Sequence, residues 1–340
     1  MTRSVRKIAG LLLPILLSLM AGALLILAAG QNPLSTYAEL FEAGFSCASG
    51  PGRCALLTAL QFATPLIFSG LSATVALRGG FFSIGQIGQM LFGAAAASWL
   101  GGYVSLPPGM HAAVALIGAA LLGGLWGLVP AFLKQMIGVN EIIATLLLNP
   151  IASVLVGLVW LPRVAETARL TPLIASTKLS AGLILALAAA LLIYLFLWQT
   201  SHGLEIRAHA NAPRFALYGG MPIYKPVFLS MALSGALAGL AGGVEVLGVH
   251  YHFVSTFSAV NDFDGLIIAF SGQLHSAGVV LFALLLGGLR TGSIVGLQIR
   301  SGIPRELGGA LIAFMLIFIA TNRFSRFESE NAKVTETFQS

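Results

Sequence analysis

The sequence predicts an all-α polytopic membrane protein with about ten transmembrane helices. Hydrophobic residues make up 57% of the 340 residues and charged residues only 9%, against roughly 25% charged residues in an ordinary soluble domain. The charged residues also separate long uncharged stretches, and a helix needs about 20 apolar residues to cross a bilayer. The loops that remain are too short for a soluble catalytic domain, so we expect a single transmembrane domain over residues 1–340.

The positions of the uncharged stretches define the predicted spans. These are residues 8–29, 56–77, 84–103, 112–133, 141–161, 180–199, 226–248, 257–272, 276–292 and 307–322. The first is interpreted as an uncleaved anchor, because it exceeds the usual apolar core of a signal peptide, about 7 to 15 residues. Residues 56–199 then form a first helix group and residues 226–322 a second. The span 257–272 contains Asp262 and Asp264, so we expect it to be short, broken or re-entrant.

The basic residues predict the orientation of the chain. With the amino terminus inside and ten spans, both termini are cytoplasmic, and eleven of the eighteen Lys and Arg residues lie in inner segments. Lys and Arg favour the cytoplasmic side of a membrane. In this assignment Arg290 belongs to an outer segment. The basic residues are scattered through the loops, so the net charge of +6 does not predict a nucleic-acid partner.

The two cysteines fall in the first outer loop. An extracytoplasmic location is one where a disulfide can persist. The spacing of Cys47 and Cys54 permits a bridge between them without requiring one. We interpret such a bridge as a loop staple rather than a redox centre.

Glycine is unusually frequent, with 40 residues, and its spacing predicts close helix packing. Small residues let membrane helices approach one another. Gly123 and Gly127 lie four residues apart, as do Gly235 and Gly239. The two segments around these pairs look alike but would cross the membrane in opposite directions. This similarity suggests an inverted repeat, with spans two to five corresponding to spans seven to ten.

Common catalytic motifs are absent. No Gly-Lys dipeptide occurs, which excludes a GxxxxGK[ST] phosphate-binding loop, and HExxH, GxSxG and CxxC are also missing. His250, Tyr251 and His252 lie at a span end, where such amphipathic side chains ordinarily rest in the membrane interface. We therefore expect neither an enzyme nor a metal site.

Polar side chains inside the spans mark candidate functional positions, because each is costly unless it is paired or faces a cavity. The candidates are Gln86, Gln89, Asn140, Glu141, Asn149, Glu245 and the stretch 261–265. Asn140 and Glu141 follow a turn, where they either cap a helix or have a functional role. Glu245 can pair with a neighbour, stay hydrated or couple a proton. Proline removes a backbone hydrogen bond, so Asn149 and Pro150 are expected to interrupt their helix beside a cavity.

The longest inner loop, residues 200–225, does not look like a plain linker. It carries several charged residues and a short amphipathic stretch between Pro213 and Gly219. Such a stretch is typical of a helix that docks on a cytoplasmic partner.

Five stretches together resemble the permease subunits of bacterial ABC importers in the branched-chain amino acid, simple sugar and nucleoside group. They are ALRGGFFSIGQIGQMLFGA (76–94), GVNEIIATLLLNPIA (138–152), GLEIRAHANAPRFALYGG (203–220), LSGALAGLAGGVEVLGVH (233–250) and FDGLIIAFSG (263–272). The resemblance covers residues 56–322. The second and fourth stretches look most like the nucleoside-type branch, in which two unlike permeases pair. The chain departs from that branch's usual NIGVEGQ at Ser83 and Ile87, which leaves the ligand open.

The resemblance implies an importer in the bacterial inner membrane that is driven by a separate subunit. The inner loop would be the coupling segment that sits in a groove of an ABC ATPase. The positions that match the coupling motif are Gly203, Glu205, Arg207, Asn211, Pro213, Tyr218 and Gly219. ATP and Mg²⁺ would be bound by that ATPase, and this chain would hold no cofactor. The other implied partners are a second, unlike permease and an extracytoplasmic substrate-binding protein.

The expected cargo is a small neutral polar solute. Amide and aromatic groups suit such a ligand, and on this basis the pathway candidates are Gln86, Gln89, Asn149, Phe263 and Asp264. A nucleoside is the leading prediction, and a simple sugar, a branched-chain amino acid or a flavin-like vitamin are the alternatives. A different class is an ion-coupled secondary transporter, in which Glu245 or Asp264 would be the coupling group.

Overall fold

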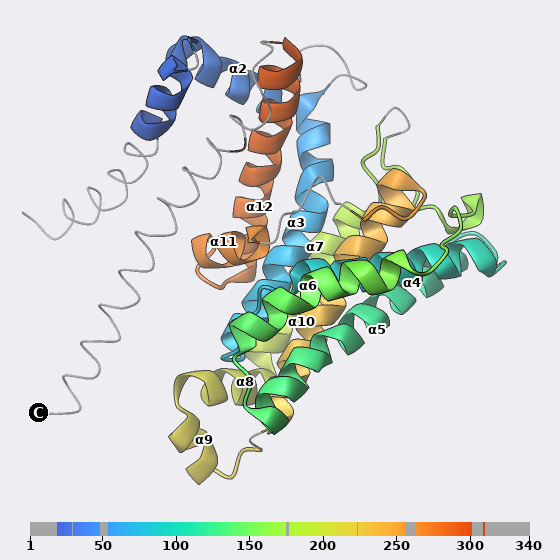
Figure 1. The fold of residues 1–340 in the computed structure, drawn as a ribbon, viewed down its shortest axis with the longest axis vertical. Helices are drawn as coiled ribbons and strands as arrows, with labels where there is room; N and C mark the ends of the chain where they lie inside the picture. The colour runs from blue at the N-terminus through green and yellow to red at the C-terminus, as the bar shows by residue number, and fades with distance from the viewer. Residues whose placement is uncertain are drawn as a thin grey trace, which may run out of the picture.

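A computed structural model describes residues 19–28, 30–47, 54–174, 177–222, 224–255, 263–300 and 309, and these residues form helices without any strand. Figure 1 shows α3 and α12 running along the long axis, while α4, α5 and α6 cross the view obliquely. The helices, in chain order, are α2 (Pro33–Phe45), α3 (Ala55–Arg78), α4 (Gln86–Tyr103), α5 (Met110–Phe132), η2 (Leu133–Ile137), α6 (Glu141–Gly157), η3 (Glu166–Ala168), α7 (Gly182–Gln199), α8 (Ser201–Asn211), α9 (Pro213–Tyr218), α10 (Tyr224–Glu245), η4 (Val246–His250), α11 (Asp264–Ser271), α12 (Ser276–Thr291) and η5 (Gly292–Arg300).

Five helices of the described part are long and apolar enough to cross a bilayer. They are Ala55–Arg78, Met110–Ile137, Gly182–Gln199, Tyr224–His250 and Ser276–Gln298, and the count is six if the bent pair Leu19–Ala28 and Pro33–Phe45 forms one span. All five coincide with predicted spans. The helices α4 and α6 occupy the predicted spans 84–103 and 141–161 but are not among the five. Most of the predicted spans 8–29 and 307–322 lies outside the described residues.

The weak span predicted at 257–272 contains only a short helix in its described part. This helix, α11, has eight residues, which rise about 12 Å against a hydrocarbon core of about 30 Å. The chain then reverses into α12 through Gln273 and Leu274, whose φ angles are 60° and 52°. Asp262 lies outside the described residues.

The structure corrects the predicted break at Asn149 and Pro150. The helix α6 continues through Pro150 to Gly157. Proline removes only its own backbone hydrogen bond, and the rest of the α6 ladder is enough to keep the segment helical. Asn149 is instead held by contacts to a different part of the chain, described below.

The glycine pairs lie where α5 packs on α10, which are the most extensively contacting helices of the described part. A Cβ atom built on Gly123 would lie 2.5 Å from the Gly235 oxygen and 2.6 Å from the Gly239 Cα. A Cβ atom on Gly127 would lie 2.6 Å from the Met231 oxygen. No side chain fits at these distances, so glycine is what permits the backbones to touch. The predicted close packing is confirmed, and the two similar glycine segments are packed against each other.

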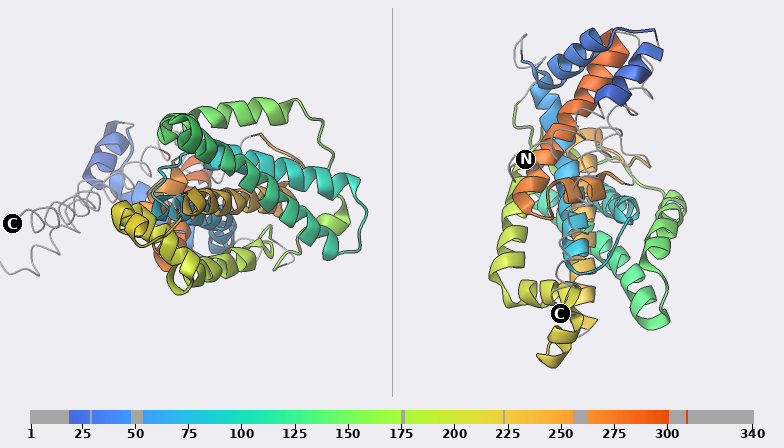
Figure 2. Two further views of the ribbon diagram at one scale, coloured as in Figure 1. Left: turned by 90° about the horizontal axis from the view of Figure 1, so that it is seen from below. Right: turned by 90° about the vertical axis from the view of Figure 1, so that its left-hand side faces the viewer.

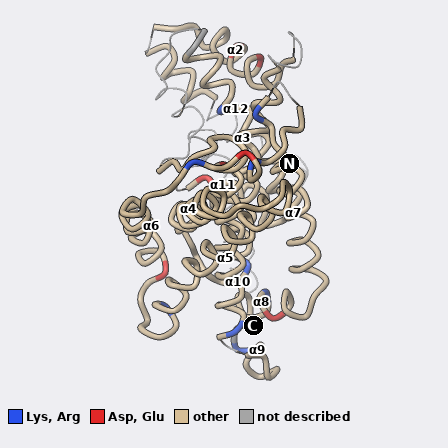
Figure 3. Tube along the Cα trace, turned by 90° about the vertical axis from the view of Figure 1, so that its right-hand side faces the viewer, with Lys and Arg blue, Asp and Glu red and all other residues tan. Residues whose placement is uncertain are grey.

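The loop predicted at 200–225 forms two short helices that project beyond the bundle. Figure 2 shows α8 and α9 at the end of the molecule farthest from α2. In Figure 3 most of the helix length is free of charge, and blue and red segments lie mainly at helix ends and in connections, including α8 and α9. The described part is therefore an apolar bundle with a polar appendage at one end.

Candidate functional site

The helix α8 is held firmly at its beginning. The Thr200 hydroxyl accepts a hydrogen bond from the Gly203 N–H at 3.1 Å and donates one to the Phe196 oxygen at 2.6 Å. A Cβ atom at Gly203 would collide with the carbonyl oxygens of Phe196 and Leu197. Ile206 is fully buried. These contacts fix the angle at which α8 leaves α7.

The far end of α8 lies against the ends of other long helices. A Cβ atom on Gly80, which follows α3, would lie 3.2 Å from the Ala210 Cα. Burial lowers the pKa of His209, and the positive charge of Lys134 lowers it further. His209 is therefore neutral at neutral pH. The neighbours of α8 outside its own loop thus come from α3, α7 and α10.

The predicted coupling residues divide into an inward and an outward set. The Arg207 guanidinium lies over the Trp198 ring at 4.3 Å from its centroid, and Asn211 donates to the Arg207 oxygen at 2.9 Å. Glu205 lies 3.4 Å from His202 on the same helix. In contrast, Tyr218 is 88% exposed. The motif therefore supplies both internal contacts and a free surface.

That free surface belongs to α9. The helix begins at Pro213 and ends at Tyr218, and the N–H of the following Gly219 donates to the Phe215 oxygen at 2.9 Å. Phe215 is 68% exposed and Leu217 is 54% exposed. Phe215 and Tyr218, three residues apart, share one face of this projecting helix, and Leu217 adds a third exposed apolar side chain; we call these three residues the α9 patch.

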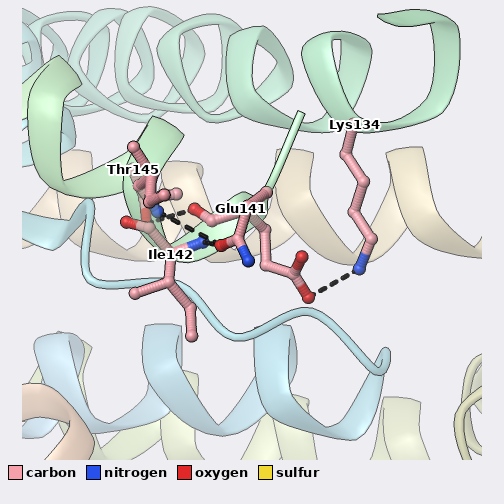
Figure 4. Close-up of polar contacts among 6 residues, drawn as sticks. Lys134, Glu141, Ile142 and Thr145 are labelled. Carbon is pink, nitrogen blue, oxygen red and sulfur yellow. Dashed lines mark hydrogen bonds and ion pairs between the residues drawn. The ribbon is translucent and has the colours of Figure 1, made fainter. Parts of the chain in front are cut away.

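Asn140 and Glu141 form a rigid corner between η2 and α6. The Asn140 side chain caps α6 by accepting from the Ile142 N–H at 2.9 Å. The Glu141 carboxylate lies 2.7 Å from the Lys134 amine (Figure 4). The Thr145 hydroxyl, also drawn in Figure 4, donates to the backbone carbonyl oxygen of Glu141 at 2.7 Å. Asn140 thus caps the amino terminus of α6.

The structure brings three of the predicted pathway residues together at the start of α4. Asn149 of α6 accepts from the Gly88 N–H at 2.9 Å and donates to the Ile84 oxygen at 2.9 Å. Gln86 and Gln89 lie on the same first turn of α4, and each is 1% exposed. The amide cluster, as we name Gln86, Gln89 and Asn149, is therefore buried between α4, α5 and α6.

Two acceptors of the amide cluster have no hydrogen-bond partner among the residues that the structure describes. They are the Oε1 atoms of Gln86 and Gln89, although the Gln86 Nε2 donates to the Ser83 oxygen at 3.0 Å. A buried acceptor without a donor costs about 1–3 kcal/mol. The cluster can therefore accept hydrogen bonds from a polar group that enters it.

The other two pathway candidates lie elsewhere. Phe263 is half exposed in the turn before α11. Asp264 is buried and forms an ion pair with Arg290 of α12. The helix α11 packs on α3 and α12, away from the amide cluster. The structure therefore corrects the outer-loop assignment of Arg290, because the negative charge of Asp264 compensates a guanidinium inside α12.

Comparison with known proteins identifies the family. The protein-family model described as the branched-chain amino acid transport system permease component matches residues 55–320 of this chain. The chain belongs to this permease family. The guanosine ABC transporter permease protein NupP of Bacillus subtilis is 35% identical over 95% of this chain and 97% of its own. The nucleoside ABC transporter permease protein NupB of Lactococcus lactis is 29% identical over 94% and 92%. The glucose ABC transporter permease protein TsgB13 of Haloferax volcanii is 28% identical over 92% and 87%.

The permease is thus a multi-pass membrane protein, as the apolar helices indicate. Its relatives are permease subunits of ABC transporters rather than enzymes. The five stretches that carry the resemblance all fall within the matched residues 55–320. The predicted family is therefore confirmed.

Glu245, the last residue of α10, has a partner in the structure. Its carboxylate lies 3.1 Å from the His250 Nε2, and it borders a cavity of about 10 Å³ that Lys178 and Gln61 also line. Such a volume holds about one water molecule. No group of three or more His, Cys, Asp or Glu residues is placed to hold a metal within the described part of the chain. Glu245 is thus paired with a neighbouring histidine in the structure.

A larger cavity of about 420 Å³ opens between α4, α5 and α6 of the permease. Its lining consists of Phe, Trp, Leu, Val, Ala and Gly residues, among them Phe92 and Leu155. Such a lining offers almost no hydrogen bonds to a polar solute. None of the residues of the amide cluster lines this cavity.

Some contacts of the permease escaped the sequence reasoning. Trp198 and Arg78 were not predicted to be functional residues, yet the guanidinium groups of Arg78 and Arg207 both lie over the Trp198 ring. Arg290 was assigned to a loop. Arginines at span ends are ordinary topology signals, so only an aromatic residue at the end of a neighbouring span could have indicated stacking. The cysteines, by contrast, are joined as Cys47–Cys54 in the structure.

Proposed function

We propose that this permease is the membrane-spanning, non-catalytic subunit of an ABC importer that moves a nucleoside into the cell. The observation that carries the proposal is the similarity to a guanosine and a nucleoside permease over nearly the whole chain. The energy would come from ATP, bound with Mg²⁺ by a separate ATPase subunit. A simple sugar, a branched-chain amino acid or a flavin-like vitamin is the alternative cargo.

The amide cluster supports a nucleoside as the cargo. Its two free acceptors lie on one turn of α4. Nucleosides carry ring amino or imino groups and ribose hydroxyls, all of which donate hydrogen bonds. A donor of this kind would satisfy Gln86 and Gln89 during passage, whereas the apolar cavity between α4, α5 and α6 offers no such match.

The α9 patch supports an ATPase as the partner. Phe215, Leu217 and Tyr218 leave apolar surface exposed on a projecting helix. Aromatic side chains of this kind are typical anchors of protein interfaces. A groove on the ATPase would cover the patch, and closure of two ATPases would move α8 and α9 together.

The proposed function implies how the transporter is assembled in the membrane. The permease would lie in the bacterial inner membrane with both termini cytoplasmic, pair with a second, unlike permease, and receive its cargo from an extracytoplasmic binding protein. Ten spans and an inverted repeat remain our proposed topology. The packing of the glycine segments of α5 and α10 against each other supports the repeat.

An uptake assay tests the cargo. Cells that express the complete transporter, in a host without other nucleoside uptake, are given labelled guanosine, uridine, glucose or riboflavin. We expect ATP-dependent uptake of at least one nucleoside and none of the others. Uptake of glucose or riboflavin alone would replace the proposed cargo, and uptake that persists without the ATPase would revive the secondary transporter.

The same assay tests the amide cluster. Gln89→Leu removes a buried acceptor, so we expect nucleoside uptake to fall while the ATPase still copurifies. Gln298→Leu, at an exposed glutamine, is the matched control and should transport normally. Equal uptake by Gln89→Leu and the wild type would remove this residue from the pathway.

A further inference from the structure

Trp198, the penultimate residue of α7, contacts arginine side chains from two other helices. The guanidinium of Arg207 on α8 lies 4.3 Å from the centroid of its ring, and that of Arg78 at the end of α3 lies 5.3 Å away. A tryptophan ring attracts cations over its face, and planar guanidinium groups stack on it. One aromatic ring therefore holds two like-charged groups from different helices together.

Arg78 extends this contact to the turn between α11 and α12. Its Nε donates to the Leu274 oxygen at 3.2 Å, and its Nη2 donates to the Gln273 oxygen at 3.4 Å. Both residues of the turn have positive φ angles, 52° and 60°, in a region that side chains with a Cβ rarely adopt. The turn conformation is thus held by a side chain that itself rests on Trp198.

A second contact joins α7 to the same turn. The His275 ring lies 6.4 Å from the Trp198 ring and 5.3 Å from the Tyr194 ring. His275 caps α12, because its Nδ1 accepts from the Ala277 N–H at 3.3 Å. Both the turn and the beginning of α12 therefore depend on the position of Trp198.

The turn follows the last residue of α11, and the first residue of the same helix is a pathway candidate. The helix α11 has only eight residues and begins at Asp264, which is paired with Arg290 of α12. A displacement of the turn would therefore move α11 and α12 relative to each other. The contacts form one continuous route from α8 through Arg207, Trp198 and Arg78 to α11.

We propose that Trp198 is a positioning residue that transmits the movement of α8 to the turn between α11 and α12. The inference rests on the proposed docking of α8 and α9 on an ATPase. It assigns Arg207 to the internal route, and leaves contact with the ATPase to the α9 patch. A contiguous chain of packed side chains can carry coupling between distant sites, and variants of its members show whether they act together.

The test measures assembly, ATP hydrolysis and uptake separately in the complete transporter. Trp198→Leu removes the aromatic face and keeps an apolar side chain. We expect the ATPase to copurify and to hydrolyse ATP at the wild-type basal rate, while guanosine uptake falls roughly tenfold, the effect of losing two cation–π contacts. Trp198→Phe keeps a ring and should restore part of the uptake. Trp160→Leu, at an exposed tryptophan outside this route, should behave as the wild type.

Arg78→Lys provides an independent variant. Lysine keeps the charge but loses the planar stack and the paired contacts to the turn, so we expect reduced uptake with intact assembly. In a double-mutant cycle, Arg78→Lys should add little to the loss caused by Trp198→Leu, because both act on one route. Should Trp198→Leu fail to accumulate, Arg78→Lys alone decides the proposal by the same readouts.

Three results would overturn the inference. Normal uptake by Trp198→Leu, or by Arg78→Lys where the first variant does not accumulate, would show that the route carries no coupling. Loss of ATPase copurification in Trp198→Leu would make the residue a support of the docking site instead. Additive losses of uptake in the cycle would show that Arg78 and Trp198 act independently. Failure of the proposed function is distinguishable, because the wild-type chain itself would then either retain no ATPase or take up no guanosine in the same assay.

Discussion

Two carboxylates in this permease show how strongly the surroundings decide the role of a residue. Asp264 and Arg290 are both buried, with side-chain exposures of 7% and 10%. Glu166 and Arg169 form a pair of the same chemistry, but their side chains are 87% and 40% exposed. Removing one member of a buried pair leaves an uncompensated charge, whereas an exposed pair is solvated by water with or without its partner.

Asp264→Asn should therefore destabilise the permease by about 3–5 kcal/mol, because the buried Arg290 loses the negative charge of its ion-pair partner. The double variant Asp264→Asn with Arg290→Gln should recover part of this loss. Glu166→Gln is the matched control and should leave the unfolding temperature unchanged. Thermal unfolding in detergent checks all three. A normal unfolding temperature for Asp264→Asn would mean that water already compensates Arg290.

At the scale of helices, the bundle depends on close contact between backbones. The glycines of α5 and α10 leave no room for a Cβ atom, while Gly157 at the end of α6 has no atom within 4 Å of such a position. In a membrane, van der Waals packing replaces hydrophobic collapse as the force between helices. The same substitution should therefore destabilise the bundle at the first place and have no effect at the second.

Gly123→Ala should destabilise the bundle by about 1–3 kcal/mol, the usual effect of overpacking a tight contact. Gly157→Ala should be neutral. The fraction of monodisperse protein after a heating series in detergent measures both. Equal losses for the two variants would show that glycine acts there through chain flexibility and not through helix contact.

The α9 patch should behave as a docking element and not as part of the bundle core. Replacing Phe215 and Tyr218 together with Ser should reduce copurification of the ATPase by at least about tenfold, since aromatic anchors dominate such interfaces. The fold should survive, because both side chains are exposed. Tyr103→Ser, at an exposed tyrosine on α4, serves as the control. Full retention of the ATPase by the double variant would place docking elsewhere.

For the whole molecule, the two cysteines report the orientation in the membrane. They are the only cysteines of the chain, they are joined in the structure, and disulfides persist on the extracytoplasmic side. That side is opposite to the one we propose for α8 and α9.

Without reductant, alkylation followed by mass analysis should therefore find no free thiol. After treatment of intact cells with a reductant that does not cross the membrane, a maleimide that also stays outside should label both cysteines. The variant with Ser at both positions should take no label. Two alkylated cysteines without reductant would refute the bridge, and labelling only after lysis would reverse the orientation.

Features carried by single segments were predictable from the sequence. Runs of apolar residues indicated the helices, the pair of glycines in α5 indicated a close contact, and the segment 203–220 indicated the appendage, because hydrophobicity, size and motif are properties of adjacent residues. The continuity of α6 through Pro150 was not predictable, because the surrounding hydrogen bonds outweigh the loss of one.

The sequence by itself determined the membrane class, the permease family and the position of the loop that projects from the bundle. Only the tertiary structure decided which residues meet: Asp264 with Arg290, Asn149 with Ile84 and Gly88, and Trp198 with two arginines. The physical reason is that a buried charge or amide needs a partner, but the partner's identity depends on how distant helices cross. That crossing is fixed by the packing of the whole bundle and by no single segment.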